Sequence, residues 1–384
     1  MHFLLVNRYF GGGSVPTGRM LLDVSLDLSR QGHTVTVIAS TSRYVKSEVP
    51  LPKNSDHVKI RWLTEIGPGR LIGWIGFWFK VAFILPATSW DRCVLLTDPP
   101  FLPFAARLAR IFTGRQRRYY WWTMDLYPEA LVAAGMISQR NPLWTCLRWL
   151  NDLGLGAMNG VIALGPRQLQ RLQTYRGWDK LADSSVVVPP WDTRPIRRIS
   201  PEENVVLRQF GWQGRKIALY SGNLGQGHLF QEFADAARWF YEGRRDDWIF
   251  AFVIRGENRR DLEVMTKDLP NIRVLDYLSD DFTADLLWAA TVHLISMKSG
   301  WEGVIVPSKL YGALQTAAPI LFIGPEDSDT ATEILRLKRG LTLSPNTSGD
   351  TVARALEELA QPSWRQEPFL NEGSSRKVAG FITR

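Results

Sequence analysis

The stretch Tyr220-Ser221-Gly222-Asn223-Leu224-Gly225 has the pattern of a strand that runs into a glycine turn, and a helical pattern follows over Leu229–Phe240. A strand, a glycine turn and a helix in this order are typical of doubly wound α/β domains. Glycines let the backbone approach a ligand closely, and the start of the following helix favours an anion. The stretch therefore predicts a phosphate-binding turn.

A second stretch, Val306-Pro307-Ser308-Lys309-Leu310-Tyr311-Gly312, places a lysine at the start of a predicted helix, Lys309–Thr316. The first turn of a helix carries unpaired N–H groups and partial positive charge, so a lysine there is unfavourable unless an anion lies opposite. The alternative is that Ser308 caps the helix and Lys309 is solvated. This segment alone leaves both interpretations open.

Strand and helix patterns alternate along the whole chain, and the alternation restarts after a proline-rich stretch. The predicted strands are His2–Val6, Thr34–Ala39, Cys93–Leu96, Tyr119–Thr123, Val161–Leu164, Lys216–Ser221, Trp248–Ile254, Ile272–Leu275, Val292–Ser296 and Ile320–Ile323. The pattern predicts an α/β protein with two doubly wound, Rossmann-like domains that face a cleft. We expect a first domain at 1–190, a linker at 191–204 and a second domain at 205–362. A C-terminal segment, 363–384, follows, and one possibility for it is that it packs back on the first domain.

The composition of the 384-residue chain is that of a globular protein with two domains. A formal net charge of +8 suits an anionic partner but does not choose among a nucleotide, a lipid phosphate and a membrane surface. The two cysteines, Cys93 and Cys146, suggest neither a zinc site nor a disulfide framework. Because no signal peptide is recognisable after Met1, we expect a cytoplasmic protein.

The candidate ligand-binding residues lie at predicted strand and helix ends. In the second domain they are Gly222, Asn223, Gly225, Arg255, Ser308 and Lys309. In the first domain they are Gly11, Gly12, Gly13, Thr17, Arg19 and Asp125. Two cations, Arg255 and Lys309, can neutralise a diphosphate. The triple glycine lacks the later glycine of a dinucleotide-binding motif, which argues against a nicotinamide site.

Three motifs together resemble the GT-B glycosyltransferases of family 4, in their bacterial exopolysaccharide and O-antigen branch: Tyr220–Gly225, Val306–Gly312 and Met124-Asp125-Leu126-Tyr127-Pro128-Glu129. The resemblance covers nearly the whole chain. It implies retaining transfer of a sugar from a nucleotide-diphosphate donor, which is a co-substrate, without a metal or bound cofactor. By this resemblance, Arg255 and Lys309 hold the diphosphate and the glycine loop at 11–13 faces the acceptor.

The chain departs from the family at the two glutamates that relatives carry eight positions apart, because Val304 and Gly312 occupy those positions. Glu302 is a candidate to reach the donor sugar by another route, and a solvated loop acid is the alternative. Asp125 is a candidate to orient the acceptor or assist its deprotonation, or else to cap the following helix.

The segment Leu71–Leu85 is apolar almost all round but shorter than the roughly 20 residues that span a bilayer. It predicts either a helix at a membrane interface or a buried core helix. A polyprenyl-linked acceptor would require peripheral attachment to the inner face of the plasma membrane. For this we expect contacts by Trp74, Phe77 and Trp78, together with the basic residues Arg107, Arg110, Arg115, Arg117 and Arg118.

The leading hypothesis is thus a glycosyltransferase with a nucleotide-sugar donor and a lipid-linked or saccharide acceptor, and no nucleic acid partner. Two alternatives stay open. A nucleotide-sugar epimerase of the same fold would need acid/base carboxylates or histidines. A non-catalytic nucleotide-sugar or lipid-binding module is the second, because the family glutamates are absent.

Overall fold

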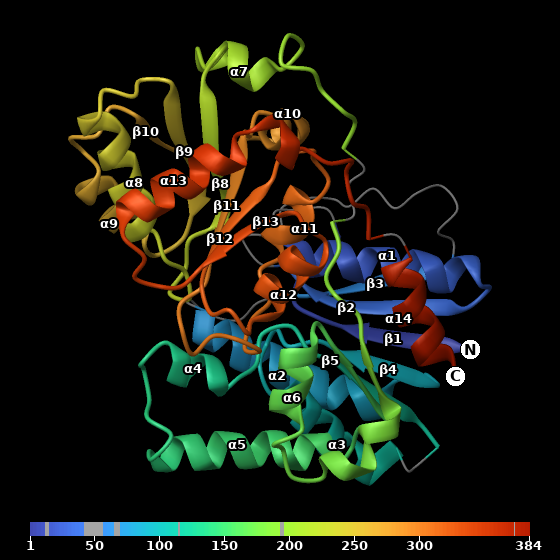
Figure 1. Ribbon diagram of the computed structural model, residues 1–384. Helices are drawn as coiled ribbons and strands as arrows, with labels where there is room; N and C mark the ends of the chain where they lie inside the picture. The colour runs from blue at the N-terminus through green and yellow to red at the C-terminus, as the bar shows by residue number, and fades with distance from the viewer. Residues whose placement is uncertain (12–14, 42–56, 65–69, 114–115, 193–195, 372) are drawn as a thin grey trace. The chain divides into compact units, whose positions relative to one another are not determined.

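The computed structural model describes the chain except for residues 12–14, 42–56, 65–69, 114–115, 193–195 and 372. It divides into two compact units (Figure 1). Unit 1 comprises Met1–Thr193, Gly303–Val306 and Glu372–Arg384, and unit 2 comprises Arg194–Glu302 and Pro307–Asn371. Each unit contains a sheet of parallel strands with helices, which confirms the predicted α/β fold class.

Unit 1 is built on a sheet of strand order β3-β2-β1-β4-β5-β6-β7, and every pairing in it is parallel. Its strands are β1 His2–Val6, β2 Thr34–Ser40, β3 Val58–Leu63, β4 Arg92–Leu95, β5 Arg118–Trp122, β6 Gly160–Ala163 and β7 Ser185–Val187. Its α-helices are α1 Pro16–Arg30, α2 Arg70–Ala87, α3 Leu102–Thr113, α4 Glu129–Ala133, α5 Pro142–Leu155, α6 Pro166–Leu172 and α14 Ser374–Thr383. The strand order reverses between β1 and β4, which makes the carboxyl ends of these two strands the expected ligand-binding position.

The C-terminal helix α14 completes unit 1. It packs against α1, and the Phe381 ring meets the Tyr120 ring of β5 edge-on with 5.8 Å between centroids. On β4, Arg92 Nη1 donates a hydrogen bond to the carbonyl of Ile382. The last residues of the chain are therefore fixed to strands that lie more than 250 residues earlier.

Unit 2 is also built on a sheet of parallel strands, in the order β10-β9-β8-β11-β12-β13. Its strands are β8 Lys216–Asn223, β9 Trp248–Arg255, β10 Ile272–Leu275, β11 Val292–Ser296, β12 Ile320–Ile323 and β13 Gly340–Leu343. Its α-helices are α7 Val205–Gln209, α8 Gln231–Glu242, α9 Arg259–Met265, α10 Thr283–Trp288, α11 Lys309–Ala313, α12 Asp329–Arg336 and α13 Gly349–Leu359. Here the strand order reverses between β8 and β11.

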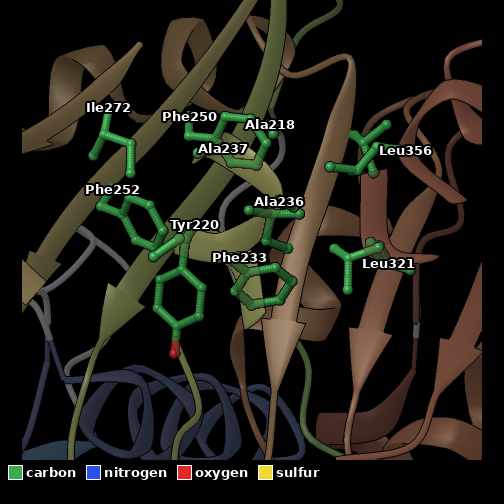
Figure 2. Packing of buried hydrophobic residues seen from close by; sticks show 14 of the residues in the cluster. Ala218, Tyr220, Phe233, Ala236, Ala237, Phe250, Phe252, Ile272, Leu321 and Leu356 are labelled. Atoms are coloured by element: carbon green, nitrogen blue, oxygen red, sulfur yellow. The ribbon is translucent and has the colours of Figure 1, made fainter. Parts of the chain in front are cut away.

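The core of unit 2 fixes the end of β8. Tyr220 stacks on Phe252 of β9 with ring centroids 5.8 Å apart, and Phe233 of α8 packs beside it. Figure 2 shows the Tyr220 ring among these side chains with its hydroxyl at the edge of the cluster. Because Tyr220 is fully buried against these two rings, its ring is held in one orientation and the core sets the position of the hydroxyl.

The predicted strands are all present, with ends shifted by at most two residues. Strands β3, β7 and β13 were not predicted. The predicted helix Lys309–Thr316 is shorter in the structure and ends at Ala313, because Gln315 and Thr316 bond to carbonyls three residues earlier and tighten the chain into turns.

Candidate functional site

Lys309 lies at the carboxyl end of β8, where the strand order of unit 2 reverses. Its Nζ donates hydrogen bonds to the Tyr220 hydroxyl at 2.5 Å and to the Asn223 carbonyl at 3.2 Å. The same nitrogen lies 4.0 Å from the centroid of the Tyr220 ring, a cation–π contact. The core position of Tyr220 therefore determines where the lysine charge is held.

In the described part of the chain, Lys309 has no carboxylate as a partner. Among the described residues, none of its hydrogen bonds or ion pairs involves a carboxylate. Burial lowers the pKa of its ammonium group from 10.5 to about 7, because a charge removed from water is destabilised. A half-buried cation with two neutral acceptors is an arrangement that an anionic ligand would stabilise.

The alternative that Ser308 caps a helix and leaves Lys309 solvated is wrong on both counts. Ser308 precedes α11 but its side chain makes no capping hydrogen bond. Lys309 points into unit 2 toward Tyr220 rather than into solvent. Since α11 has only five residues, the lysine and its neighbours, more than the helix terminus, define this site.

The glycine turn after β8 lies directly against this lysine. Gly222 has φ +136°, a conformation that L side chains rarely adopt, and its Cα faces the Lys309 side chain. Asn223 packs between two further glycines: a Cβ on Gly225 would meet its Nδ2 at 3.1 Å, and one on Gly256 its Oδ1 at 2.7 Å. The turn is thus a close-packed backbone surface, and its binding of a phosphate stays a prediction.

Arg255 ends β9 beside the same turn. It is the strand partner of Asn223, and its carbonyl accepts from Leu224 N at 2.7 Å. Its guanidinium is exposed and lies 4.6 Å from the centroid of the Tyr277 ring. The structure therefore brings Arg255, Asn223 and Lys309 to one sheet end, although Arg255 stacks on Tyr277 while Lys309 lies over Tyr220.

A buried network behind the turn was not anticipated from the sequence. His228 Nδ1 donates to the Ser296 carbonyl at 2.8 Å, and burial, with the charge of Lys309 second, lowers the pKa of His228 to about 3. Ser296 Oγ donates to the Leu229 carbonyl at 2.7 Å and accepts from Leu229 N. These bonds tie the turn to the end of β11. His228 is therefore neutral, and its role is structural.

In unit 1, Asp125 is exposed in the bend after β5. The helix α4 begins after Pro128, so the alternative in which Asp125 caps that helix is wrong. At the strand-order reversal of unit 1, Nη1 of the buried Arg8 forms an ion pair with Oδ1 of the half-buried Asp98 at 3.3 Å. This pairing was not predicted, since the two residues are 90 positions apart.

The other predicted acceptor residues surround the start of α1. Gly11 has φ +86° and its N donates to the Gly18 carbonyl at 3.0 Å. Arg19 is largely buried and Thr17 is half-buried in the first turn of α1. Gly12 and Gly13 lie outside the described residues. In unit 2, Glu302 is half-buried in the loop after β11, and its contact with a donor sugar stays a prediction.

The predicted membrane contacts of α2 need correction. Phe77 is buried, Trp74 meets Tyr127 edge-on, and Trp78 Nε1 donates to the Phe101 carbonyl, so these three side chains face the protein. Five other residues form an exposed apolar stripe of α2: Leu71, Ile72, Ile75, Phe79 and Phe83. The core-helix alternative holds for one face of α2, whereas the other face is apolar and exposed, and its contact with a membrane stays a prediction.

The predicted basic cluster is also divided. Arg110 donates to the carbonyl of Ala157 and to Asn159 Oδ1, and Arg117 donates to the carbonyl of Thr88, so both stabilise unit 1 itself. Arg107 is exposed, Arg118 bonds to the C-terminal residue, and Arg115 lies outside the described residues.

Within the part of the chain that the structure describes, no helix is long and apolar enough to cross a membrane. No group of three or more His, Cys, Asp or Glu residues there is arranged to hold a metal ion.

Comparison with known proteins adds direct relatives, although no model of a protein family matches the chain. The chain is 23% identical over 294 residues to a Pseudomonas aeruginosa protein named as a probable glycosyltransferase, WbjE, a match that spans 74% of this chain and 70% of the relative. Over 102 residues, it is 33% identical to an Escherichia coli K12 protein named as a colanic acid biosynthesis glycosyl transferase, WcaI, a match that spans 26% and 24%.

Solved structures agree on the fold. The chain is similar to WaaG, a glycosyltransferase involved in lipopolysaccharide biosynthesis, with a TM-score of 0.71, 16% identity and full coverage of both chains. It is also similar to the UDP-GlcNAc 2-epimerase from Neisseria meningitidis, with a TM-score of 0.63, 12% identity and full coverage of both. The GT-B fold is confirmed, but the fold alone does not separate a transferase from an epimerase.

The two sequence relatives make that distinction, because both are named as glycosyltransferases. Together with the fold, they confirm the resemblance predicted from the three motifs. The chain is a GT-B glycosyltransferase, related to enzymes of bacterial polysaccharide biosynthesis.

Proposed function

We propose that this GT-B glycosyltransferase moves a sugar from a nucleoside-diphosphate donor, with retention of configuration, to a polyprenyl-linked acceptor in surface polysaccharide synthesis. Unit 2 binds the donor and unit 1 binds the acceptor. Lys309 and Arg255 supply the positive charge that other enzymes obtain from a metal ion, so the transfer needs none.

The observation that carries this proposal is the state of Lys309. Its ammonium group is half-buried, lies against the backbone of Gly222 and, among the residues that the structure describes, has only the Tyr220 hydroxyl and the Asn223 carbonyl as acceptors. A diphosphate beside it would supply the missing negative charge and restore the ordinary preference of lysine for its charged form. Arg255, on the neighbouring strand end, is exposed and able to reach a second phosphate.

The reaction asks little of the protein beyond charge and position. The bond between the sugar and the donor phosphate breaks, and negative charge develops on the departing diphosphate, where Lys309 and Arg255 stabilise it. The acceptor hydroxyl forms the new bond on the same face of the sugar and passes its proton to a departing phosphate oxygen. Asp125, exposed after β5, accepts a hydrogen bond from the acceptor and orients it.

Incubation with a panel of nucleotide sugars and a membrane lipid extract tests the proposal. We expect sugar transfer to the lipid fraction with stoichiometric release of nucleoside diphosphate. An epimerised donor without transfer would identify an epimerase instead. Binding without either product would identify a non-catalytic module.

Membrane attachment through unit 1 completes the proposal. The exposed apolar stripe of α2 includes Phe79 and Phe83, which are 54% and 75% exposed, and the neighbouring helix α3 adds exposed Ile111 and Phe112. So much apolar surface is unusual on a protein that stays in water, and a bilayer interface accommodates it. An acceptor with a polyprenyl tail cannot leave the bilayer, so the acceptor-binding unit must approach it.

Flotation with liposomes that contain anionic lipid tests this attachment. We expect a Phe79→Glu, Phe83→Glu variant to lose most of the floated fraction without a change in fold, because both side chains are exposed. Val264→Glu, at an exposed apolar position of unit 2, is the matched control and should float like the parent. An unchanged floated fraction in the α2 variant would contradict the proposal.

A further inference from the structure

The loop that presents Asp125 is fixed on both sides by buried polar contacts. Met124 N donates to Thr97 Oγ1 at 3.2 Å, and Leu126 N donates to the Val304 carbonyl at 3.0 Å. Further on, Asn151 Nδ2 donates to the Tyr127 carbonyl. Asp125 itself is exposed between these fixed points. Such a loop therefore holds Asp125 at an exposed position while its neighbours are immobilised.

One side chain, Gln168 of α6, makes the central contact of this arrangement. It is completely buried, its Nε2 donates to the Met124 carbonyl at 2.6 Å, and its Oε1 accepts from Leu164 N at 2.8 Å. Thr123 Oγ1 lies 2.8 Å from the same Oε1. Because a backbone N–H can only donate and a carbonyl can only accept, these partners permit one orientation of the amide.

The first turn of α6 supports the other side of the loop as well. Gly303, with φ +69°, packs on Arg167 so closely that a Cβ would lie 2.7 Å from the Arg167 carbonyl oxygen. The next residue, Val304, supplies the acceptor for Leu126 N. Two consecutive residues of α6 therefore fix the chain before and after Asp125.

We infer that Gln168 is a positioning residue that fixes the Asp125 carboxylate for the acceptor hydroxyl. The inference rests on the proposed role of Asp125. A buried amide is unfavourable unless its hydrogen bonds are made, and Gln168 bonds to the Thr123 hydroxyl, the Met124 carbonyl and Leu164 N. These buried hydrogen bonds restrict the loop to one conformation. A fixed loop is what the orientation of an acceptor requires.

The first test combines Gln168→Met with Asp125→Asn. We expect Gln168→Met to lower the rate of transfer to lipid extract about 10- to 100-fold, because a small displacement of a positioned group has effects of that order. Its affinity for nucleoside diphosphate should stay within about twofold of the parent. In the Asp125→Asn background, Gln168→Met should cause no further loss. Gln170→Met makes the same chemical change at an exposed position of α6 and is the matched control.

The second test uses Gln168→Glu and keeps the inference testable if the methionine variant does not fold. The neutral carboxylic acid can donate to the Met124 carbonyl, whereas the ionised carboxylate cannot. The ratio of variant to parent transfer rates should therefore be highest at low pH and fall as the introduced acid ionises. The affinity for nucleoside diphosphate should show no such fall relative to the parent.

The possible outcomes separate the inference from the function on which it rests. Transfer by Asp125→Asn at the parent rate would overturn the role of Asp125 and the inference with it. If Asp125→Asn is impaired but the Gln168 and Asp125 effects multiply, or the Gln168→Glu ratio is independent of pH, Gln168 is only a structural residue and the proposed function stands.

Discussion

Each of the two units has a cation at the reversal of its strand order, but the two cations differ in whether the protein supplies a carboxylate partner. In unit 1, the buried Arg8 follows β1 at the strand-order reversal and forms an ion pair with the half-buried Asp98, which follows β4. In unit 2, Lys309 lies at the end of β8 at the corresponding reversal and, among the described residues, donates hydrogen bonds only to neutral oxygen atoms. A cation that the protein has already neutralised has little to gain from an anionic ligand. The difference therefore favours unit 2 as the diphosphate-binding unit.

Removing each cation in turn is the most direct test of this difference between Lys309 and Arg8. We expect Lys309→Ala to weaken nucleoside-diphosphate binding about 100-fold, since hydrogen bonds to a charged group contribute about 1.5–3 kcal/mol. The transfer rate should fall further, because charge on the leaving group is greatest in the transition state. Arg8→Ala should leave diphosphate affinity within about twofold and lower the melting temperature, because it leaves the Asp98 carboxylate without its buried cation. Calorimetric titration, turnover and thermal unfolding give the three readouts.

Lys298→Ala is the control for loss of positive charge alone, since Lys298 is exposed two residues after β11. It should bind nucleoside diphosphate nearly as the parent does. A loss in Arg8→Ala as large as that in Lys309→Ala would show that the donor is not confined to unit 2.

A smaller effect sharpens the comparison within unit 2. Arg255 has the Tyr277 ring as its neighbour, whereas Arg259, four residues later, is bound to Glu263 and Asp276. We expect Arg255→Ala to weaken diphosphate binding about tenfold, because an exposed cation is partly screened by water and salt. Arg259→Ala should leave affinity unchanged. Equal losses in the two variants would indicate that Arg255 acts only through the overall charge of the surface.

The sequence identified the residues at strand ends but not the contacts between them. Gly222, Asn223 and Lys309 were predicted together because a parallel fold brings strand ends to one edge. The hydrogen bond from Lys309 to Tyr220 spans 89 positions and depends on the strand order and on which face of β8 carries the tyrosine. The register of a sheet is set by packing, which a single sequence does not display.

The helix α2 illustrates a different limit. Trp74, Phe77 and Trp78 have the spacing of one helix face, and the exposed stripe has the spacing of another. Because both faces are apolar, hydrophobic periodicity does not indicate which one packs on the protein. The sequence thus predicted an apolar helix correctly but assigned its outer face to the wrong aromatic residues.

The pH dependence of donor binding is the smallest expected effect and the most specific to Lys309. With a pKa of about 7 in the free protein, this lysine is about half protonated at pH 7 and about one-tenth protonated at pH 8. If only the charged form binds diphosphate, affinity should fall about fivefold between these values, with uptake of a proton on binding. Calorimetric titration in buffers of different ionisation enthalpy measures both quantities.

Lys309→Arg isolates this effect from titration of the ligand itself, because a guanidinium stays charged throughout the range. The parent should lose affinity relative to this variant as the pH rises from 7 to 8, and a constant ratio would contradict the low pKa of Lys309. Stability should change in the opposite sense. Between about pH 7 and 10.5 the unfolded lysine holds a proton that the folded one has lost, so the free energy of unfolding of the ligand-free parent should rise with pH across this window relative to Lys309→Met. The pH dependence of diphosphate affinity and that of the free energy of unfolding together test how the charge of Lys309 is balanced. They distinguish a lysine whose charge is neutralised by the bound donor from a cation that, like Arg8, is already paired within the protein.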